Sequence, residues 1–390
     1  MLPYDPSAVA ELVAELDSWR DLLDHRGALP RRWAGRMRRD LEAESVAAST
    51  SMEGIPVTVE EVHRILVGVR PGTVSEHDAE LVRGYRDAME FALRRADDPG
   101  FVWNRELLVA LQDRILAGRF RDGAGRLRTA PAYVVNSTSG DVVFAPPDAA
   151  QVPSLIDRAM EQMEQGHPHP ALSAAWVHVA IAAVHPFRDG NGRAARISAS
   201  LAMLRDGFRL PEFTSLEEWW GRHLSDYYAA FTVLGDLFDT SVDVTPFIRA
   251  HLEAQLRQVR ALDLRERVQR QIWLAVEEAI AERGLAPRVA NAAWDAFFGR
   301  DVTNAYYREL ADVTDVTAST DLKGAVAAGF LRAEGAGRAR HYVAGDSLYR
   351  DLARYVGLEV AESGEIGSTH LIVGLTQRVH REAEARRRTS

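Results

Sequence analysis

Apolar side chains recur at helical spacing along most of the first 260 residues. In the opening stretch, Val9, Leu12, Val13 and Leu16 follow one another three or four positions apart and predict an amphipathic helix over 8–23. The same kind of pattern predicts further helices over 36–51, 59–67, 76–96, 104–117, 152–165, 171–184, 193–205, 216–237 and 246–260. The predicted body of the chain is therefore mainly helical.

One segment, residues 128–147, breaks this pattern. It contains the β-rich runs Ala132-Tyr133-Val134-Val135 and Asp141-Val142-Val143-Phe144, which are separated by Asn-Ser-Thr-Ser-Gly and followed by two prolines. Two short β-rich runs around a turn-rich loop are typical of a β-hairpin. We expect this hairpin to project from the helical body.

The chain changes character after about residue 262. A long helix over 265–283 and another ending at Phe298 precede a helix over 304–311 and a second one that opens after Thr317, a pairing typical of a helix-turn-helix. The runs 330–332 and 340–343, joined by glycines, supply a β-wing. The arginine-rich end from Arg378 is expected to fray.

The 390-residue length exceeds what one hydrophobic core usually organises, so we expect more than one domain. The hydrophobic content of 46% and the charged content of 26% are those of a folded globular protein. The pattern predicts four regions. They are an N-terminal helical region over 1–100, a core over 101–260, a winged helix-turn-helix over 262–345, and a helical or partly disordered tail over 346–390.

Charge and cysteine content narrow the class of protein. A net charge of −9 argues against a surface coated with nucleic acid and permits only a local basic patch. The absence of cysteine excludes disulfides, thiolate metal sites and cysteine nucleophiles. The start of the sequence lacks a secretory signal pattern, and the longest apolar run, 171–184, is too short to span a bilayer. We therefore expect a cytoplasmic protein without a membrane partner.

The chemistry concentrates in residues 185–196, HPFRDGNGRAAR. The apolar helix 171–184 delivers His185 at its end, where Pro186 prevents the helix from continuing. The Gly190-Asn191-Gly192 run lets backbone N–H groups approach an anion closely. The histidine is thus presented beside a candidate anion site.

The following helix is expected to start at about Arg193, so its free amides and positive dipole end face the same loop. Arg193 and Arg196 lie on one helix face and could bind further phosphate oxygens, and Asp189 offers a carboxylate to Mg²⁺. Each of these residues alone is ordinarily structural. Their conjunction within twelve residues predicts a nucleotide-phosphate site beside a catalytic histidine.

This segment resembles the signature of the Fic (Fido) family, His-Pro-Phe-x-Asp/Glu-Gly-Asn-Gly-Arg-x-x-Arg, and matches it at every fixed position. The resemblance implies a mainly helical Fic fold with a β-hairpin flap, and transfer of AMP from ATP to a Ser, Thr or Tyr hydroxyl of a target protein or of the chain itself. It implies that His185 is the base, that Asp189 binds Mg²⁺ and that Arg193 contacts the leaving phosphates. The nucleotide-binding residues implied are Gly190, Asn191, Gly192, Arg193, Ala194, Ala195, Arg196, Tyr227 and Tyr228.

Some of these assignments have alternatives. Tyr227 and Tyr228 resemble family residues near the adenine base but fit core aromatic positions equally well. Related enzymes rotate or replace the nucleotide, and Asp189 with the complete arginine pair favours AMP transfer here. A Fic enzyme that uses another phosphate donor, or that removes AMP, remains an alternative.

Upstream, Ser49-Thr50-Ser51-Met52-Glu53-Gly54 resembles the family's inhibitory motif, Ser/Thr-x-x-x-Glu-Gly/Asn. Its position indicates the class with an N-terminal inhibitory helix, here about 36–54. The resemblance implies that Glu53 bonds Arg196 and keeps ATP out of its productive pose. The alternative is structural, since a helix that ends in Glu-Gly is commonplace.

The C-terminal pattern resembles the winged helix-turn-helix often appended to Fic proteins. Such a module binds DNA or mediates protein contacts, including homodimers. The second helix carries only Lys323, with Arg338, Arg340 and His341 in the wing, so its electrostatic footprint for DNA is thin. The rival interpretation is a DNA-binding regulator whose Fic domain senses or modifies a partner.

Overall fold

The computed structural model describes residues 1–25, 31–66, 68–136, 139–358 and 367–389, without the side chains of 31–39, 338 and 383–389. The chain divides into two compact units, Met1–Arg260 and Ala261–Ser390. Four sequence expectations lie outside the described residues: the helix end at Val67, the hairpin-loop positions 137 and 138, the tail segment 359–366 and the side chain of Arg338.

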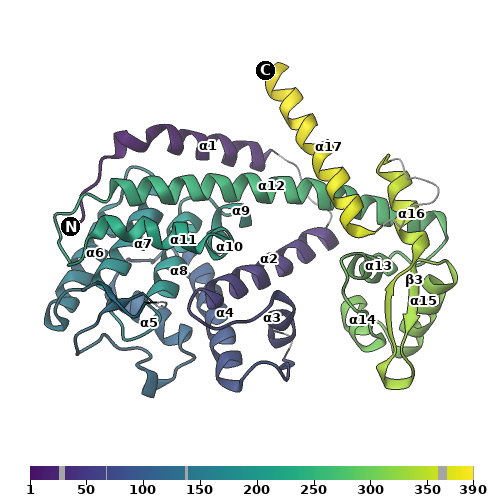
Figure 1. Cartoon of the computed structure of the whole chain (residues 1–390), viewed down its shortest axis with the longest axis horizontal. Helices are drawn as coiled ribbons and strands as arrows, with labels where there is room; N and C mark the ends of the chain where they lie inside the picture. Colours follow the sequence, from purple (N-terminus) through teal and green to yellow (C-terminus); the bar gives the residue numbers. More distant parts are fainter. Residues whose placement is uncertain (26–30, 67, 137–138, 359–366, 390) are drawn as a thin grey trace. The chain divides into compact units, whose positions relative to one another are not determined.

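The first unit is built from helices, and α4 and α5 each begin after a residue whose side chain caps the helix. Ser75 Oγ accepts a hydrogen bond from Asp78 N, and Asn104 Oδ1 accepts one from Leu107 N. The helices are α1 (Ala10–Asp24), α2 (Arg31–Ser51), α3 (Val59–Leu66), α4 (Glu76–Ala96), α5 (Arg105–Ile115), α6 (Val152–Gln165), α7 (Pro170–Val184), α8 (Asn191–Arg205), α9 (Pro211–Thr214), α10 (Leu216–Arg222), α11 (Leu224–Ala230) and the start of α12 (Thr245–Glu282) (Figure 1).

Helices α7 and α8 form the centre of this unit and pack against each other (Figure 1). Helix α7 is apolar on all sides, and almost every side chain in it is buried, including Trp176. A helix that is apolar all round can be accommodated only inside the core. The long run of alanine and valine in α7 thus fixes the position of the loop that follows it.

Helix α2 lies against α10 through its C-terminal half. Its buried positions include Leu41, Ala43 and Val46. The contact is close: a Cβ added to Gly221 of α10 would lie only 3.0 Å from Ala48 Cβ. This packing holds the C-terminal end of α2, and hence the segment around Glu53, against the core.

The predicted hairpin is present as the antiparallel strands β1 (Val134–Val135) and β2 (Val142–Phe144). Val134 lies opposite Phe144, whose side chain is buried, while Val135 lies opposite Val142 and both are exposed. The base of the second strand is held by Ala145 N, which donates to Asp236 O at 2.8 Å. The hairpin is therefore anchored at its base and exposed toward its tip.

The second unit contains the remaining part of α12, then α13 (Val289–Phe297), α14 (Asn304–Ala311), α15 (Asp315–Ala327), β3 (Leu331–Glu334), β4 (His341–Ala344), α16 (Asp346–Tyr355) and α17 (Ser368–Thr389). A buried carboxylate joins three of its elements. Asp321 of α15 binds the Arg288 guanidinium through both oxygens, at 2.6 and 3.0 Å, and accepts from Tyr307 OH at 2.9 Å. Strands β3 and β4 pair in register from Leu331 opposite Ala344.

Several boundary expectations are wrong. The expected helix 216–237 is divided into α10, α11 and a short 3₁₀ turn, Phe231–Leu234. The helices expected over 246–260 and 265–283 are one continuous α12, because neither proline nor glycine interrupts the sequence after Pro246 until Gly284. Helix α15 begins at Asp315 rather than after Thr317, since the cap is Thr314, whose hydroxyl accepts from Thr317 N.

Helix α8 begins two residues earlier than expected, at Asn191, with Gly190 before it in the left-handed conformation.

Among the described residues, no helix combines the length and the apolar character that crossing a bilayer requires.

Candidate active site

His185 ends α7 in a left-handed backbone conformation, with φ 49° and ψ 59°. A non-glycine residue in this region costs roughly 1–2 kcal/mol, so the surrounding contacts must hold it there. Its N–H still donates to Ile181 O at 2.9 Å, while Pro186 blocks further helix. The reversal directs the chain away from α7 and leaves the imidazole half-buried at the start of the loop.

The environment of His185 favours the neutral imidazole. Burial lowers the pKa of His185 below its usual value, and the positive charge of Arg128 acts in the same direction. A hydrogen bond involving the Ala182 backbone and the negative charges of Glu53 and Asp189 oppose this shift. A neutral imidazole at cellular pH is able to accept a proton.

The side chain of Asn191 fixes the loop after His185. Phe187 N donates to Asn191 Oδ1 and Asn191 Nδ2 donates to Phe187 O, both at 2.9 Å. Gly190 has φ 83°, and a Cβ there would approach Ile115 Cγ2 at 3.3 Å. These contacts use the Asn191 side chain within the loop, so any contact from Asn191 to a ligand would come from its backbone.

The loop opens at the N-terminus of α8, where the first-turn amides of Asn191, Gly192 and Arg193 have no place in the helical hydrogen-bond ladder. Free amides and the positive end of the helix dipole converge at this point. The local geometry is that of an anion site.

Arg193 supplies independent evidence for an anion. Its residue surface is only 1% exposed, and its Nη2 contacts Asp189 Oδ1 at 3.0 Å. Its Nε and Nη1 are buried and have no hydrogen-bond partner among the described residues. Buried guanidinium donors without acceptors are costly, so an anionic ligand bound here would satisfy them.

Arg196, one helical turn further along, is in contrast fully engaged. Its Nε donates to Ser49 Oγ at 2.9 Å, its Nη1 to Tyr227 OH at 3.2 Å, and its Nη2 to Ser49 O and to Glu53 Oε1 at 3.1 and 2.8 Å. The sequence is consistent with Arg196 as a phosphate ligand and also as the partner of Glu53. The structure has it bound to Glu53 and Ser49.

Glu53 also lies directly against the phosphate loop. A Cβ added to Gly192 would stand 2.4 Å from Glu53 Oε1 and 3.0 Å from Arg196 Nη1. The Glu53 carboxylate therefore reaches the first turn of α8 as well as Arg196. It occupies space that a ligand bound to both features would need.

The two tyrosines differ in their surroundings. Tyr227 is buried, and its hydroxyl contacts both Arg196 Nη1 and His178 Nε2, the latter at 3.1 Å. Tyr228 is 56% exposed and donates to Met52 O at 3.3 Å. Tyr227 thus packs in the core behind Arg196, while Tyr228 lies at the surface next to the Glu53 segment.

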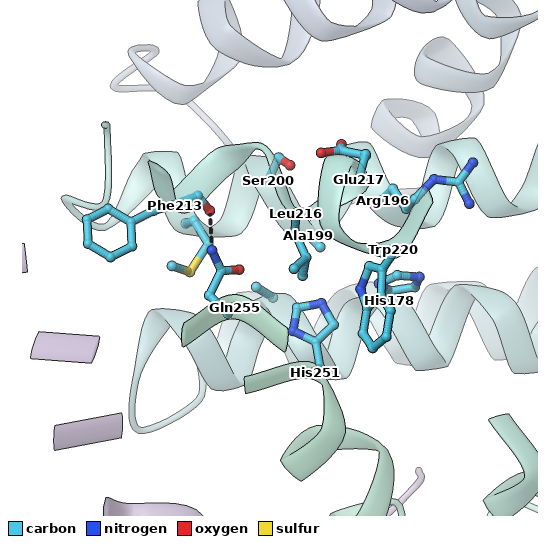
Figure 2. A pocket seen from close by; sticks show the side chains of 12 residues that line it. His178, Arg196, Ala199, Ser200, Phe213, Leu216, Glu217, Trp220, His251 and Gln255 are labelled. Carbon is cyan, nitrogen blue, oxygen red and sulfur yellow. Dashed lines mark hydrogen bonds between the residues drawn. The ribbon is translucent and has the colours of Figure 1, made fainter. Parts of the chain in front are cut away.

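Ala194 and Ala195 have fully buried side chains in α8, and the Ala194 N–H donates to Gly190 O within the helix. Their expected role in nucleotide binding stays a prediction. Arg196 of the same helix lines a cavity of about 10 Å³, together with His178, Glu217 and His251, among others (Figure 2). This volume excludes any ligand larger than water.

Two residues absent from the sequence-based site also shape it. Gln112 of α5 donates from Nε2 to Asp189 O at 3.1 Å and accepts from Gly125 N at 2.7 Å. Arg128, which the sequence pattern marks only as the start of the hairpin segment, donates to carbonyl groups at the end of α7. Neither belongs to a local motif, so no sequence pattern could have assigned these contacts.

The donor set for a metal is small. Asp189 is the acidic residue of the loop, and its side chain is 53% exposed. Among the described residues, no group of three or more His, Asp or Glu side chains could hold a metal by itself. Mg²⁺ is commonly bound by one or two carboxylates together with substrate phosphates. Asp189 could therefore hold Mg²⁺ only when phosphates bound at the neighbouring anion site supply further ligands to the ion.

Part of the chain is similar to known proteins. Residues 102–203 match the model of the Fic/DOC family. The chain is 28% identical over 284 residues to a protein adenylyltransferase, fic-1, of Caenorhabditis elegans. The aligned region covers 66% of this chain and 52% of that protein. It is 25% identical over 253 residues to a protein adenylyltransferase Fic of Nematostella vectensis, covering 64% and 55%. The chain thus spans about half the length of these two curated relatives.

Solved structures share the fold. A Fic family protein from Desulfovibrio desulfuricans matches 88% of this chain and 97% of its own, with a TM-score of 0.56 and 21% identity. A Fic domain-containing signalling protein from Bacteroides thetaiotaomicron matches 65% of this chain and 95% of its own, with a TM-score of 0.54 and 21% identity. Residues 102–203 thus match the Fic/DOC family, and the chain has a mainly helical Fic fold and distant homology to Fic protein adenylyltransferases.

Proposed function

We propose that the chain transfers AMP from ATP to a Ser, Thr or Tyr hydroxyl of a target protein or of itself, and that Glu53 holds this activity inhibited. One observation carries the proposal. The half-buried His185 borders an anion site at the start of α8, where the Arg193 guanidinium has two donors without partners among the described residues. A base next to a phosphate-sized anion site is what phosphoryl-type transfer to a hydroxyl requires.

In the proposed reaction the hydroxyl oxygen of the target forms a bond to the α-phosphorus of ATP. The bond from that phosphorus to the pyrophosphate oxygen breaks, and pyrophosphate leaves. The His185 ring accepts the hydroxyl proton, a role that its lowered pKa supports. The first-turn amides of α8 and Arg193 stabilise the negative charge that grows on the phosphate oxygens.

Asp189 is the residue proposed to hold Mg²⁺ together with the phosphates. The ion would neutralise phosphate charge during transfer. Asp189 now binds Arg193 Nη2, so it stands beside the anion site where such an ion is needed.

Inhibition by Glu53 follows from competition. Its carboxylate bonds Arg196 and lies against Gly192, both of which a nucleotide phosphate would approach. A charge-assisted hydrogen bond in a partly dehydrated cleft is strong enough to compete with a phosphate oxygen for the same guanidinium. Removal of the Glu53 carboxylate is therefore expected to open the site.

The β1–β2 hairpin is the proposed docking element for the target. Its outer residues Tyr133, Val135 and Val142 are all exposed. An exposed hairpin edge can pair with an extended target segment through backbone hydrogen bonds. This would bring a hydroxyl to the site with little side-chain specificity.

We also infer that α13–α15 with β3 and β4 form a winged helix-turn-helix. The described charges around α15 do not favour DNA as its partner, because Lys323, Arg332 and Arg340 are offset by Asp312, Asp315 and Glu334. A DNA-binding face needs clustered positive charge.

The function is tested by incubating the chain with labelled ATP and Mg²⁺ in a matched lysate. Glu53→Gly should label one or more proteins strongly, the wild type weakly, and His185→Ala not at all. Glu60→Gln, at an exposed glutamate of α3 seven positions after Glu53, is the matched control and should behave as wild type. If Glu53→Gly transfers no AMP while another phosphate donor supports modification, the proposed reaction is wrong.

A further inference from the structure

Arg128 lies between the β1–β2 hairpin and the turn at His185 and Pro186 that follows α7, here called the catalytic turn. Its guanidinium is buried, with the residue only 7% exposed, although it lies between the exposed Arg126 and Thr129. Burial of a charged group requires that its donors be satisfied. The hydrogen-bond partners of the Arg128 guanidinium therefore indicate its role in the structure.

All of these partners are backbone carbonyl groups. Arg128 Nε donates to His185 O at 2.8 Å, and Nη2 donates to Val184 O at 3.4 Å. Nη1 donates to Ala130 O at 3.1 Å, and Nη2 also donates to Pro147 O at 2.5 Å. One planar group thus joins both ends of the hairpin segment to the last carbonyl groups of α7.

The backbone of Arg128 strengthens the same junction. Its N–H donates to Pro186 O at 2.9 Å, so Arg128 contacts the carbonyl groups of three consecutive residues, Val184, His185 and Pro186. The final carbonyl groups of a helix lack intrahelical donors and carry the negative end of the helix dipole. A guanidinium placed there satisfies both needs.

This arrangement bears directly on His185. Its left-handed conformation is unfavourable for a residue with a side chain, and the Arg128 bond to His185 O is made to that same residue. A lysine could supply the charge but not the fork that reaches four carbonyl groups in different directions.

We propose that Arg128 is a positioning residue that holds the backbone of His185 in its catalytic turn and couples this turn to the base of the β1–β2 hairpin. The proposal rests on the proposed function for its kinetic consequences only. The hydrogen bonds predict effects on local structure that can be measured without any activity.

Two substitutions separate geometry from charge. Arg128→Lys keeps a positive charge near His185 and loses most of the carbonyl contacts, whereas Arg128→Gln loses both. Arg126→Gln is the matched control, because Arg126 is an exposed arginine two positions away. The folded state of each variant is checked by its thermal unfolding before comparison.

The first readout is amide hydrogen exchange. Both Arg128 variants should exchange faster at residues 129–136 and 184–187 than wild type, with the remainder of the first unit unchanged and Arg126→Gln identical to wild type. Exchange that is unchanged at both segments would overturn the proposal. Faster exchange throughout the unit would also overturn it, because it would show a general structural role.

The second readout is the NMR titration of the His185 ring, identified by its absence in His185→Ala. The charges that affect this ring include Arg128, Glu53 and Asp189. Arg128→Gln should raise the pKa of His185, and Arg128→Lys should shift it less. If the pKa of His185 is the same in Arg128→Gln as in wild type, the guanidinium does not act on His185 and the proposal is overturned.

The third readout is kinetic and uses the Glu53→Gly background. Arg128→Lys should lower kcat about 10- to 100-fold with little change in the KM for ATP, as expected when a catalytic group is misplaced. Arg128→Gln should in addition move the acidic limb of the pH profile upward. A lowered profile without that movement would mean that the loss of activity does not act through His185, and would count against the proposal. If the Glu53→Gly parent itself transfers no AMP, the proposed function fails while exchange and titration still decide the role of Arg128.

Discussion

Glu53 Oε1 lies 2.8 Å from Arg196 Nη2, and the same oxygen would be only 2.4 Å from a Cβ on Gly192. One carboxylate therefore contacts both the second arginine of the signature and the phosphate loop. Because Ser49 contributes two further acceptors to Arg196, the end of α2 is tied to α8 by three of its oxygen atoms. We expect ATP binding at the site to depend on whether the Glu53 carboxylate occupies the space between Arg196 and Gly192.

Replacement of Glu53 by glutamine should increase the affinity for ATP. Glutamine retains the size of the side chain but removes the negative charge that opposes a phosphate and holds the guanidinium. Loss of a charge-assisted contact of about 1.5–3 kcal/mol corresponds to roughly 10- to 100-fold tighter binding. Isothermal titration calorimetry with ATP and Mg²⁺ measures this. Equal affinities of Glu53→Gln and the Glu60→Gln control would show that the carboxylate does not compete.

Arg193 and Arg196 should respond oppositely to replacement by methionine. Arg193 has two buried donors without partners among the described residues, so Arg193→Met should leave the free energy of unfolding unchanged or raise it. Arg196 makes four hydrogen bonds, so Arg196→Met should lower the free energy of unfolding by about 2–4 kcal/mol. Urea unfolding of the two variants compares them directly.

The same pair provides a functional contrast. In the Glu53→Gln background, Arg193→Met should abolish measurable ATP binding despite its retained stability. A stable Arg193→Met variant that still binds ATP would show that the guanidinium does not serve the anion site. A strongly destabilised one would show that it has a structural partner instead.

Local pattern was sufficient for much of the fold. The expected ranges 76–96, 152–165 and 304–311 coincide with α4, α6 and α14, because each has a continuous helical period with clear stop and start residues. Pattern failed at α12, where two plausible helices fuse. Nothing local distinguishes a break from a continuation when neither glycine nor proline is present.

The candidate site divides in the same way. Residues 185–196 are contiguous, so their shared loop could be predicted from the sequence. The burial of Arg193 could not, nor could the contact between Tyr227 and Arg196 or the one between Arg128 and His185 O, which joins positions 57 apart. These contacts depend on how separate helices pack, and neighbouring residues do not encode that packing.

Replacement of Gly192 by alanine should block the site even when the Glu53 carboxylate is absent. The added methyl group would point to the position that Glu53 Oε1 now occupies, 3.0 Å from Arg196 Nη1. A phosphate approaching the first turn of α8 would meet the same methyl group. The double variant Glu53→Gln with Gly192→Ala should therefore bind ATP at least 10-fold more weakly than Glu53→Gln alone, as measured by calorimetry. Equal binding would place the phosphate elsewhere.

Glu217 should give the first unit a pH-dependent stability. Its side chain is buried beside the cavity behind Arg196, and Tyr85 OH donates to its Oε1 at 3.2 Å (Figure 2). Burial raises the pKa of Glu217 to about 7 in the folded protein, against the opposing effects of its own backbone hydrogen bond, the Arg196 charge and the Tyr85 hydrogen bond. The carboxyl group of the unfolded chain has its ordinary, lower pKa.

Between these two pKa values the folded protein binds a proton that the unfolded chain has released. The contribution of Glu217 to stability is therefore complete at low pH and is lost as the pH rises toward about 7, at about 1.4 kcal/mol per pH unit. Glu217→Gln keeps an acceptor for Tyr85 and removes the titration. Relative to wild type, its free energy of unfolding should rise by about 2–3 kcal/mol between pH 5 and pH 8.

Urea unfolding at several pH values measures this difference, and the exposed Glu60→Gln provides the control, whose curve should run parallel to that of wild type. The other ionisable groups that line the cavity are His178, His251 and Arg196. Burial keeps the pKa of His251 at about 3 and that of His178 well below its usual value, so neither takes up a proton between pH 5 and pH 8. A Glu217→Gln curve parallel to wild type would thus mean that Glu217 is already ionised in the folded protein, with Arg196 as its counter-charge.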